Sequence, residues 1–324
     1  MNDLLSSRLA RAIERRDPLV QELGSDTSAL RLVHGSGDGI EGLTADRLGP
    51  AILVERHRRS APAEELVSEL VRRLAADPVF LKERWSRDPA QLAGKQVGGP
   101  SMNVDELVVR ELGLSFAVRL VAGEHVGLFL DSRPARALVR QLAVGRRVLN
   151  LFSYTGGFGV VAASGNARST TNVDSKPSAH DAARHNYLLN DLPFDTRTFL
   201  KDDVIRHLNR AARGCGRYDL IVLDPPPRFD RAGGGTYRAR EGYGRLVTRC
   251  LRVISADGLL LAGSNAFGRD AGELERVVLE STAEVGATVE VVERVFPGPD
   301  FPPAPERPTC MCVLLRVVRP GTGR

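Results

Sequence analysis

The sequence predicts an α/β protein whose larger part is a doubly wound, mostly parallel sheet, preceded by a small α+β domain. Three observations support this fold class. From Arg136 onward, strand-like apolar runs alternate with helical patterns. Before about residue 115, short strands joined by Gly- and Asp-containing turns indicate antiparallel pairing. Residues 148–159 form a glycine-bearing turn between an apolar strand and an apolar helix, as at the ligand-binding end of such a sheet. We therefore place the two domains at residues 1–115 and 116–324.

The smaller domain begins with a charged amphipathic helix pattern, MNDLLSSRLARAIERRD, which lacks the apolar core of a signal peptide. Short strands follow within ALRLVHGSGDGIEGLTADRLGPAILVERH, then a helix at Ala61–Ala76 and a strand in VFLKERW. Ser101–Leu120 predicts an antiparallel pair that turns at Glu111-Leu112-Gly113. Together these elements predict a small α+β domain.

The larger domain alternates strands and helices in order. We expect strands at Arg147–Phe152, Ser169–Asp174, Thr196–Lys201, Tyr218–Asp224, Gly258–Ser264, and a terminal pair at Val289–Phe296 and Cys310–Val318. Helices are expected at Gly157–Ser164, Ser178–Asn190, Val204–Arg213, Tyr237–Arg252 and Ala271–Val285. This alternation predicts a Rossmann-like, mostly parallel sheet with an antiparallel hairpin at its end.

Composition limits the functional class. Forty-five basic against 40 acidic side chains give a net charge of +5, which permits a polyanionic partner without requiring one. No apolar run reaches 18 residues, so we predict no membrane span. The cysteines are few and irregularly spaced, and no Cys/His cluster has zinc-site spacing, so we expect no metal and a reduced, cytoplasmic protein. They are Cys215, Cys250, Cys310 and Cys312.

The glycine turn and two acidic strand ends predict a cofactor. The turn, SYTGGFG at Ser153–Gly159, fits neither G-x-G-x-x-G nor G-x-x-x-x-G-K-[ST], yet its glycines let the backbone pass close to a ligand. Asp174 ends the next strand, where a carboxylate can take both ribose hydroxyls, and Asp224-Pro225-Pro226 ends another. The order of these three motifs along the chain predicts an adenosine-containing cofactor, and S-adenosylmethionine (SAM) is the best candidate. The alternative is a tight turn, a helix cap at Asp174 and a strand-terminating turn at Asp224.

At these motifs the sequence resembles the class I SAM-dependent methyltransferases. More narrowly, it is similar to the family of 23S ribosomal RNA large subunit methyltransferases I and K, over roughly Leu30–Val318. The resemblance rests on LRLVHGSGDGIEGLTADRLG, GLFLDSRPAR, RVLNLFSYTGGFGVVAA, ARSTTNVDSKPSAHDAARHNYLLNDL, FLKDDVIRHL, YDLIVLDPPPRF and LLLAGSNAFG. It implies a SAM-binding sheet and methylation of a base in large-subunit ribosomal RNA (rRNA).

The resemblance also implies which residues contact the cofactor. Asp131 and Arg133 are expected over SAM, and Asp203 is expected near the adenine amino group, with Asp202 as the neighbouring choice. The whole predicted cofactor set is Asp131, Arg133, Asn150, Phe152, Ser153, Tyr154, Thr155, Gly156, Asp174, Asp203 and Asp224.

Some family members carry an extra RNA-binding module, for which this chain has no room before Leu30. RNA contact is therefore expected from the small domain and from basic residues such as Arg56, Arg58 and Arg59. The alternative is that these arginines are a solvated strand end.

The segment after the fifth strand bears on the methylated atom. Methylation at pyrimidine C5 needs a cysteine thiolate at C6, and the carbon-5 branch of the family carries it in a Ser-Cys segment. Here the matching segment is Gly263-Ser264-Asn265, which argues against that route. Guanine N7 has an in-plane lone pair and needs only positioning, and Ser264-Asn265 resembles the K branch, which makes 7-methylguanine.

The predicted catalytic residues are Asp224, Pro225, Pro226 and Asn265. Asp224 and the carbonyls of the two prolines would hold the base edge, because proline removes N–H donors and leaves carbonyl acceptors. Asn265 would add a hydrogen bond.

The sequence thus predicts a SAM-dependent methyltransferase acting on rRNA, at a guanine nitrogen such as N7. Three alternatives stay open: a small-molecule or protein methyltransferase, a C5-cytosine rRNA methyltransferase with another cysteine, and a non-catalytic RNA-binding or assembly factor. The oligomeric state is left open between monomer and homodimer.

Overall fold

The computed structural model describes residues 3–74, 77–86, 88–103, 106–123, 125–214, 217–230, 236–264, 267, 271–303 and 312–319. The chain forms two compact units: Met1–Arg133 with Gly298–Glu306, and Pro134–Pro297 with Arg307–Arg324. The first boundary falls later in the chain than the predicted residue 115, and the return of Gly298–Glu306 to the first unit was not predicted.

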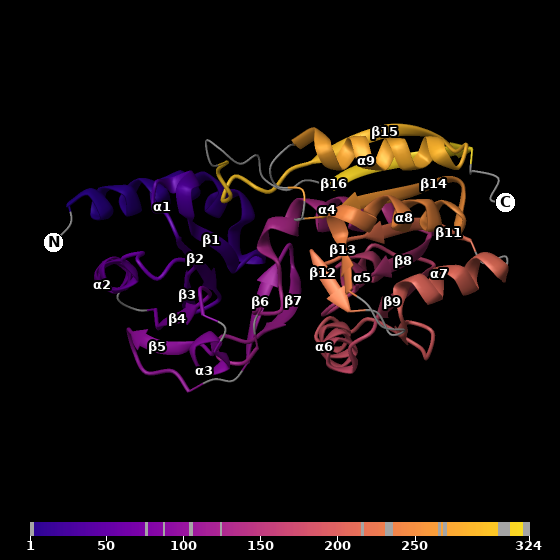
Figure 1. Ribbon diagram of the computed structural model, residues 1–324. Helices are drawn as coiled ribbons and strands as arrows, with labels where there is room; N and C mark the ends of the chain where they lie inside the picture. Colours follow the sequence, from indigo (N-terminus) through magenta and orange to yellow (C-terminus); the bar gives the residue numbers. More distant parts are fainter. Residues whose placement is uncertain are drawn as a thin grey trace. The chain divides into compact units, whose positions relative to one another are not determined.

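The first unit is built on a five-stranded sheet (Figure 1), with strand order β1-β2-β3-β4-β5. β3 and β4 are parallel and the other neighbours are antiparallel, so α2 serves as the crossover between β3 and β4. The bounds are α1 (Asp3–Leu23), β1 (Ala29–His34), β2 (Leu43–Leu48), β3 (Ala51–Arg56), α2 (Ala63–Arg73), β4 (Val79–Glu83), α3 (Pro89–Leu92) and β5 (Lys95–Gly98). The predicted small α+β domain is therefore present.

A hairpin follows this sheet, formed by β6 (Leu107–Glu111) and β7 (Leu114–Val118). Its two turn residues, Leu112 and Gly113, have φ of 51° and 81°, which is the conformation that suits a two-residue hairpin loop. The hairpin belongs to the first unit because Ser28 N donates to Arg110 O and Arg110 N donates to Ser28 Oγ, each at 2.9 Å.

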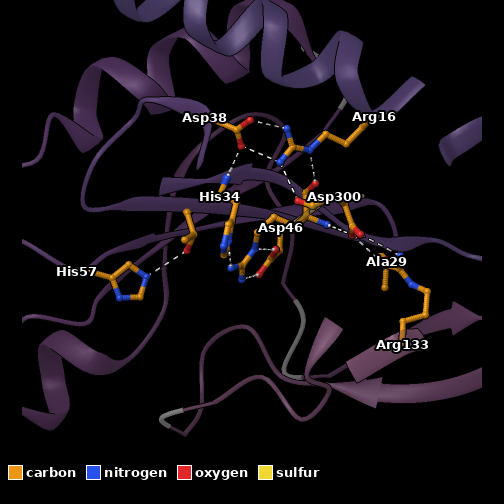
Figure 2. Close-up of polar contacts among 10 residues, drawn as sticks. Arg16, Ala29, His34, Asp38, Asp46, His57, Arg133 and Asp300 are labelled. Carbon is orange, nitrogen blue, oxygen red and sulfur yellow. Dashed lines mark hydrogen bonds and ion pairs between the residues drawn. The ribbon is translucent and has the colours of Figure 1, made fainter. Parts of the chain in front are cut away.

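Buried arginines fix the return segment within the first unit (Figure 2). Arg16, 1% exposed, donates to both carboxylate oxygens of Asp38 at 2.7 Å and to Asp300 O at 2.8 Å. Arg133 donates to the Asp300 carboxylate at 3.0 and 3.2 Å and to Ala29 O at 3.0 Å. Because buried charges need both a counter-ion and hydrogen bonds, this network ties residues far apart in the sequence to one arrangement.

The second unit is the predicted doubly wound sheet, with seven strands in the order β10-β9-β8-β11-β14-β16-β15 (Figure 1). β16 is antiparallel to β14 and to β15, and the other neighbouring strands of this sheet are parallel. The strands are β8 (Arg147–Leu151), β9 (Ser169–Asp174), β10 (Phe199–Lys201), β11 (Tyr218–Leu223), β14 (Ile254–Gly263), β15 (Thr288–Val295) and β16 (Cys312–Arg319).

The helices of this unit are α4 (Arg133–Leu142), α5 (Gly157–Ser164), α6 (Pro177–Leu188), α7 (Val204–Arg213), α8 (Ala239–Leu251) and α9 (Ala271–Glu284). α5 packs with α6, and α8 packs with α7 and α9. The predicted strands and helices are confirmed to within a few residues at their ends. α4 and the small hairpin of β12 (Arg228–Asp230) and β13 (Thr236–Arg238) are additions.

The direction of winding reverses between β8 and β11. From β8 the chain moves outward to β9 and β10, and then crosses to the other side of β8 to form β11 and β14. Ligands of such sheets bind at this switch point, outside the carboxyl ends of the strands. Among the described residues, no helix is both long and apolar enough to cross a membrane.

Candidate active site

The carboxyl ends of five parallel strands bring most of the predicted site residues to one edge of the sheet. Phe152 follows β8, Asp174 ends β9, Asp202 follows β10, Asp224 follows β11 and Ser264 follows β14. Residues distant in the sequence therefore share the place where this architecture holds its ligand.

The turn after β8 has a strained backbone. Phe152, Tyr154 and Gly156 have φ of 56°, 48° and 78°, a region that residues with a side chain rarely adopt. A Cβ at Gly156 would lie 2.8 Å from Ala183 Cβ, so only glycine fits there. Strain of this kind persists where the surrounding structure holds it, and it is concentrated at ligand-binding sites.

Asp174 joins the turn after β8 to the turn after β9. Its Oδ2 accepts a hydrogen bond from Tyr154 N at 2.9 Å, and its Oδ1 accepts one from Lys176 N at 3.0 Å. Its carbonyl accepts from Asp202 N at 3.0 Å, which connects the next strand end. The carboxylate is thus held rigidly beside the glycine turn, where the sequence places the ribose.

Two predicted cofactor residues, Asn150 and Thr155, connect the turn after β8 to neighbouring elements. The Asn150 side chain is buried and donates to Asn172 Oδ1 at 2.9 Å, so its amide braces β8 against β9. Thr155 O accepts from Asn186 Nδ2 at 2.9 Å, which fixes the turn to α6.

Ser153 provides a test of whether the site fits SAM. Its N–H donates to Val173 O at 3.1 Å, but its buried Oγ has no hydrogen-bond partner among the described residues. A buried hydroxyl without a partner is costly unless a ligand or water completes it. The strained glycine turn lies next to Ser153, and Asp174 is held beside that turn. These residues together fit an adenosine-containing, amino-acid-bearing cofactor such as SAM.

The structure distinguishes the two neighbouring aspartates after β10. Asp202 is 6% exposed and pairs with Arg206 and with Arg210, at 2.5 and 2.8 Å. Burial alone would raise the pKa of Asp202, but its hydrogen bonds with these arginines outweigh burial and lower it. Asp203 caps α7 by accepting from Arg206 N through Oδ1, and its Oδ2 has no partner within the described part of the chain.

The Asp224 loop is held by a buried tyrosine that the sequence did not single out. Tyr243, on α8, donates its hydroxyl toward Leu223 O at 3.3 Å and Gly263 O at 2.9 Å. It is fully buried and stacks edge-on against Phe267, with ring centroids 5.4 Å apart. Tyr243 therefore fixes the spacing of the β11 and β14 carboxyl ends, where Asp224 and Ser264 begin.

One cysteine lies at this same edge. Cys312 begins β16 and pairs with Gly263, the last residue of β14. A Cβ placed on Gly263 would lie 2.7 Å from Cys312 Sγ and 3.6 Å from Asp224 Oδ1, so thiol and carboxylate flank the same point. Cys250, by contrast, is buried in the core cluster, and burial raises the pKa of its thiol. Asn265, Cys215 and Cys310 lie outside the described residues.

Three predicted catalytic residues are placed. Asp224 is half-buried, Pro225 is buried and Pro226 is exposed. Neither proline has an N–H group to donate. Within the described ranges, no group of three or more His, Cys, Asp or Glu could hold a metal ion.

The remaining predicted residues belong to the first unit. Asp131 lies in a short 3₁₀ helix, Leu130–Ser132, and the Arg133 guanidinium is engaged by Asp300. The basic cluster is not a free positive surface: Arg56 pairs with Glu83 and Glu64, and Arg58 pairs with Glu41. Arg59 lies over the Trp85 ring, 5.4 Å from its centroid. The alternative, a solvated strand end, fits these partners better.

Comparison with known proteins agrees with this geometry. The model of the S-adenosylmethionine-dependent methyltransferase family matches residues 30–316. The chain belongs to this family. Ribosomal RNA large subunit methyltransferase I of Tolumonas auensis is 30% identical over 319 residues, covering 96% of this chain and 79% of that protein. The protein of the same name from Shewanella amazonensis is 30% identical over 306 residues, covering 93% and 76%.

Solved structures confirm the fold of this methyltransferase. A protein described as a methyltransferase and crystallised with S-adenosylhomocysteine (SAH) has a TM-score of 0.88 at 23% identity, over 97% of this chain and 81% of that one. A tRNA methyltransferase of M. jannaschii has a TM-score of 0.59 at 13% identity, over 97% and 79%. Because the chain belongs to the S-adenosylmethionine-dependent methyltransferase family, SAM is its cofactor, as predicted. Both relatives described above are named methyltransferase I. The likeness of Ser264-Asn265 to the methyltransferase K branch stays a prediction.

Sequence reasoning missed Tyr243 and the position of Cys312. Tyr243 lies in the helical run AREGYGRLVTRCL, where nothing marks it apart from a core residue. Cys312 was assigned to the terminal hairpin, and the register that pairs it with Gly263 could have been found only from the reversed strand β16.

Proposed function

We propose that this methyltransferase transfers the methyl group of SAM to a base of large-subunit rRNA. The observation that carries the proposal is the match, across more than nine-tenths of the chain, to proteins named for that substrate. The strand-end residues support it, because they combine a cofactor turn with an Asp-Pro-Pro loop suited to a planar base. SAM, when bound, supplies an electrophilic methyl group.

The protein's residues then position cofactor and base. Asp174 would accept hydrogen bonds from the ribose hydroxyls, and Asp203, through Oδ2, from the adenine amino group. The hydroxyl of Ser153 would complete its hydrogen bonding with the amino-acid part of SAM. Phe152, Tyr154, Thr155 and Gly156 would shape the turn around the cofactor. Asp131 stays part of the proposed set, whereas Arg133 would act by holding the fold of the first unit.

For the target we propose a guanine nitrogen, with N7 as the first choice. Asp224 and the carbonyls of Pro225 and Pro226 would hold the base edge, with a further hydrogen bond from Asn265. Direct displacement needs the base presented unstacked and in line with the methyl group, and it needs no covalent catalyst. Rigid placement of Asp224 by Tyr243 serves this requirement.

The position of Cys312 favours one second candidate, methylation at cytosine C5. In that reaction the Cys312 thiolate would bond to C6, and the electron pair pushed to C5 would take the methyl group. Removal of the C5 proton by a base would then expel the thiolate. We place this route second because the Ser-Cys segment expected for it reads Ser264-Asn265 here. Cys250 is too deeply buried to take part.

The test compares the modified nucleosides of rRNA from cells with and without the gene by mass spectrometry. Loss of 7-methylguanosine in the deletion strain supports the first route, and loss of 5-methylcytidine supports the second. Complementation with Cys312→Ala should restore the modification in the first case and fail in the second, while Cys250→Ser serves as the control. If rRNA modifications are identical with and without the gene, rRNA is not the substrate.

A further inference from the structure

The free edge of the larger sheet carries a hollow that the proposed SAM contacts do not use. It has a volume of about 470 Å³ and lies where β10 meets α7. Its lining residues are Phe199, Leu200, Lys201, Asp202, Arg206 and Arg210. Three cationic side chains face one carboxylate, so the hollow is positively charged.

The arrangement follows from the sequence of α7. Val204, Ile205 and Leu208 are buried on one side of the helix, whereas Arg206, Arg210 and the exposed Arg213 recur at three- and four-residue spacing on the other. The side chains of Arg206 and Arg210 remain 63% and 57% exposed although both pair with Asp202. One buried carboxylate therefore holds two guanidinium groups in place and neutralises only one of their charges.

An exposed aromatic ring lies beside this hollow. Phe194 is 40% exposed, and its centroid is 5.4 Å from that of Phe199, which lines the hollow. The buried Tyr187 packs edge-on against Phe194, with ring centroids 6.2 Å apart, and this contact restricts the Phe194 ring. A positively charged surface next to a fixed, exposed ring is the combination that binds single-stranded nucleic acid.

We propose that this surface binds a single-stranded segment of the RNA substrate. Lys201, Arg206 and Arg210 contact its phosphates, and one base stacks on Phe194. The inference rests on the proposed function, since it assumes an RNA substrate. It replaces the expected role of the first unit's arginines: Arg56 and Arg58 have their own carboxylates, whereas here cations exceed carboxylates by three to one.

The test uses the full-length protein and a fluorescein-labelled 20-nucleotide oligouridine, with anisotropy measured from 50 to 200 mM KCl. The main variant combines Lys201→Gln, Arg206→Gln and Arg210→Gln. Its control combines Arg294→Gln and Arg316→Gln, two exposed arginines on β15 and β16 that pair with Glu275 and Glu290. The dependence of log K on log salt should weaken by about 0.7 per lost phosphate contact in the triple variant and stay unchanged in the control.

Two further variants leave the Asp202 pairs intact. Lys201→Gln alone should lower the salt slope by about 0.7. Phe194→Ala should weaken oligouridine binding about tenfold, whereas Phe296→Ala, at another exposed ring, should leave it unchanged. Calorimetry should give the same SAH affinity for the wild type, Lys201→Gln, Phe194→Ala and the control variants.

The outcomes separate this proposal from the proposed function. If the wild type binds oligouridine with a steep salt dependence and all variants match their controls, the surface is wrongly assigned and an RNA substrate survives. If the wild type does not bind RNA and rRNA is unmodified by the gene, both proposals fail. Weakened binding in the triple variant, in Lys201→Gln and in Phe194→Ala supports the surface.

Discussion

Replacement of Asp174 by alanine should loosen the cofactor turn and weaken SAM binding together. The carboxylate is the acceptor for Tyr154 N and for Lys176 N, at 2.9 and 3.0 Å, and it stands where the ribose is proposed to bind. Alanine removes both acceptors and the two oxygens offered to the cofactor.

The size of each effect follows from the surroundings of each N–H group. Lys176 is exposed, so water can replace the lost acceptor there. Tyr154 N lies in the strained turn, and losing its acceptor should lower the free energy of unfolding by about 1–3 kcal/mol. Hydrogen bonds to a charged group are worth about 1.5–3 kcal/mol, so losing the ribose contact should weaken cofactor affinity about 10- to 150-fold.

Urea denaturation measures the first effect, and titration calorimetry with SAH measures the second. Asp181→Ala is the control, because Asp181 lies on the exposed face of α6 and pairs only at the surface with Arg184. An Asp174→Ala protein that loses stability but binds SAH within twofold of the wild type would refute the ribose assignment. Asp174 would then be a brace for the turn and nothing more.

Three other changes test the rest of the structure. Burial, aided by a neighbouring guanidinium, lowers the pKa of His34 and of His57 from 6.5 to about 4, so the unfolded chain binds more protons in this window. Stability should therefore fall as pH drops from 6.5 to 4, and equal urea midpoints at pH 7 and pH 5 would contradict this. Tyr243→Phe removes the hydroxyl that two buried carbonyls accept from, and should lower the free energy of unfolding by about 1–2 kcal/mol. It should also lower kcat more than it raises the KM for SAM. An unchanged kcat would show that the Asp224 loop does not depend on the Tyr243 hydroxyl. Asp300→Ala leaves the buried Arg133 without its main counter-ion and should destabilise the protein by about 3 kcal/mol in urea denaturation, whereas a loss below 1 kcal/mol would show that another carboxylate replaces it.

Much of the second unit could be predicted because its signals are local. Apolar strands alternating with helical patterns require a parallel sheet, and parallel strands place their carboxyl ends at one edge. The glycine turn and Asp174 could therefore both be assigned to this edge from the sequence. The turn predicted at Glu111-Leu112-Gly113 is found one residue shorter, at Leu112 and Gly113, because turn chemistry is contained in the residues that form the turn.

The charges could not be assigned to partners from the sequence. Arg56 and Arg58 look like a basic surface until Glu83 and Glu41 are brought beside them. No local pattern marks Arg206 and Arg210, although the fold leaves both to share the single carboxylate of Asp202. A side chain's charge is a local property, but its neutralisation depends on residues that only folding brings near.

The sequence by itself determined the class of sheet, the strand that carries the glycine turn and the acidic residues at the strand ends. Each of these depends on periodicity or on adjacent residues. The tertiary structure alone decided that Asp202 is buried and paired with two arginines, whereas Asp203 caps α7 through one carboxylate oxygen. It also placed Cys312 beside Gly263 and made Asp300 part of the first unit. These features depend on contacts between distant segments, which sheet register and buried ion pairs set and which no local pattern encodes.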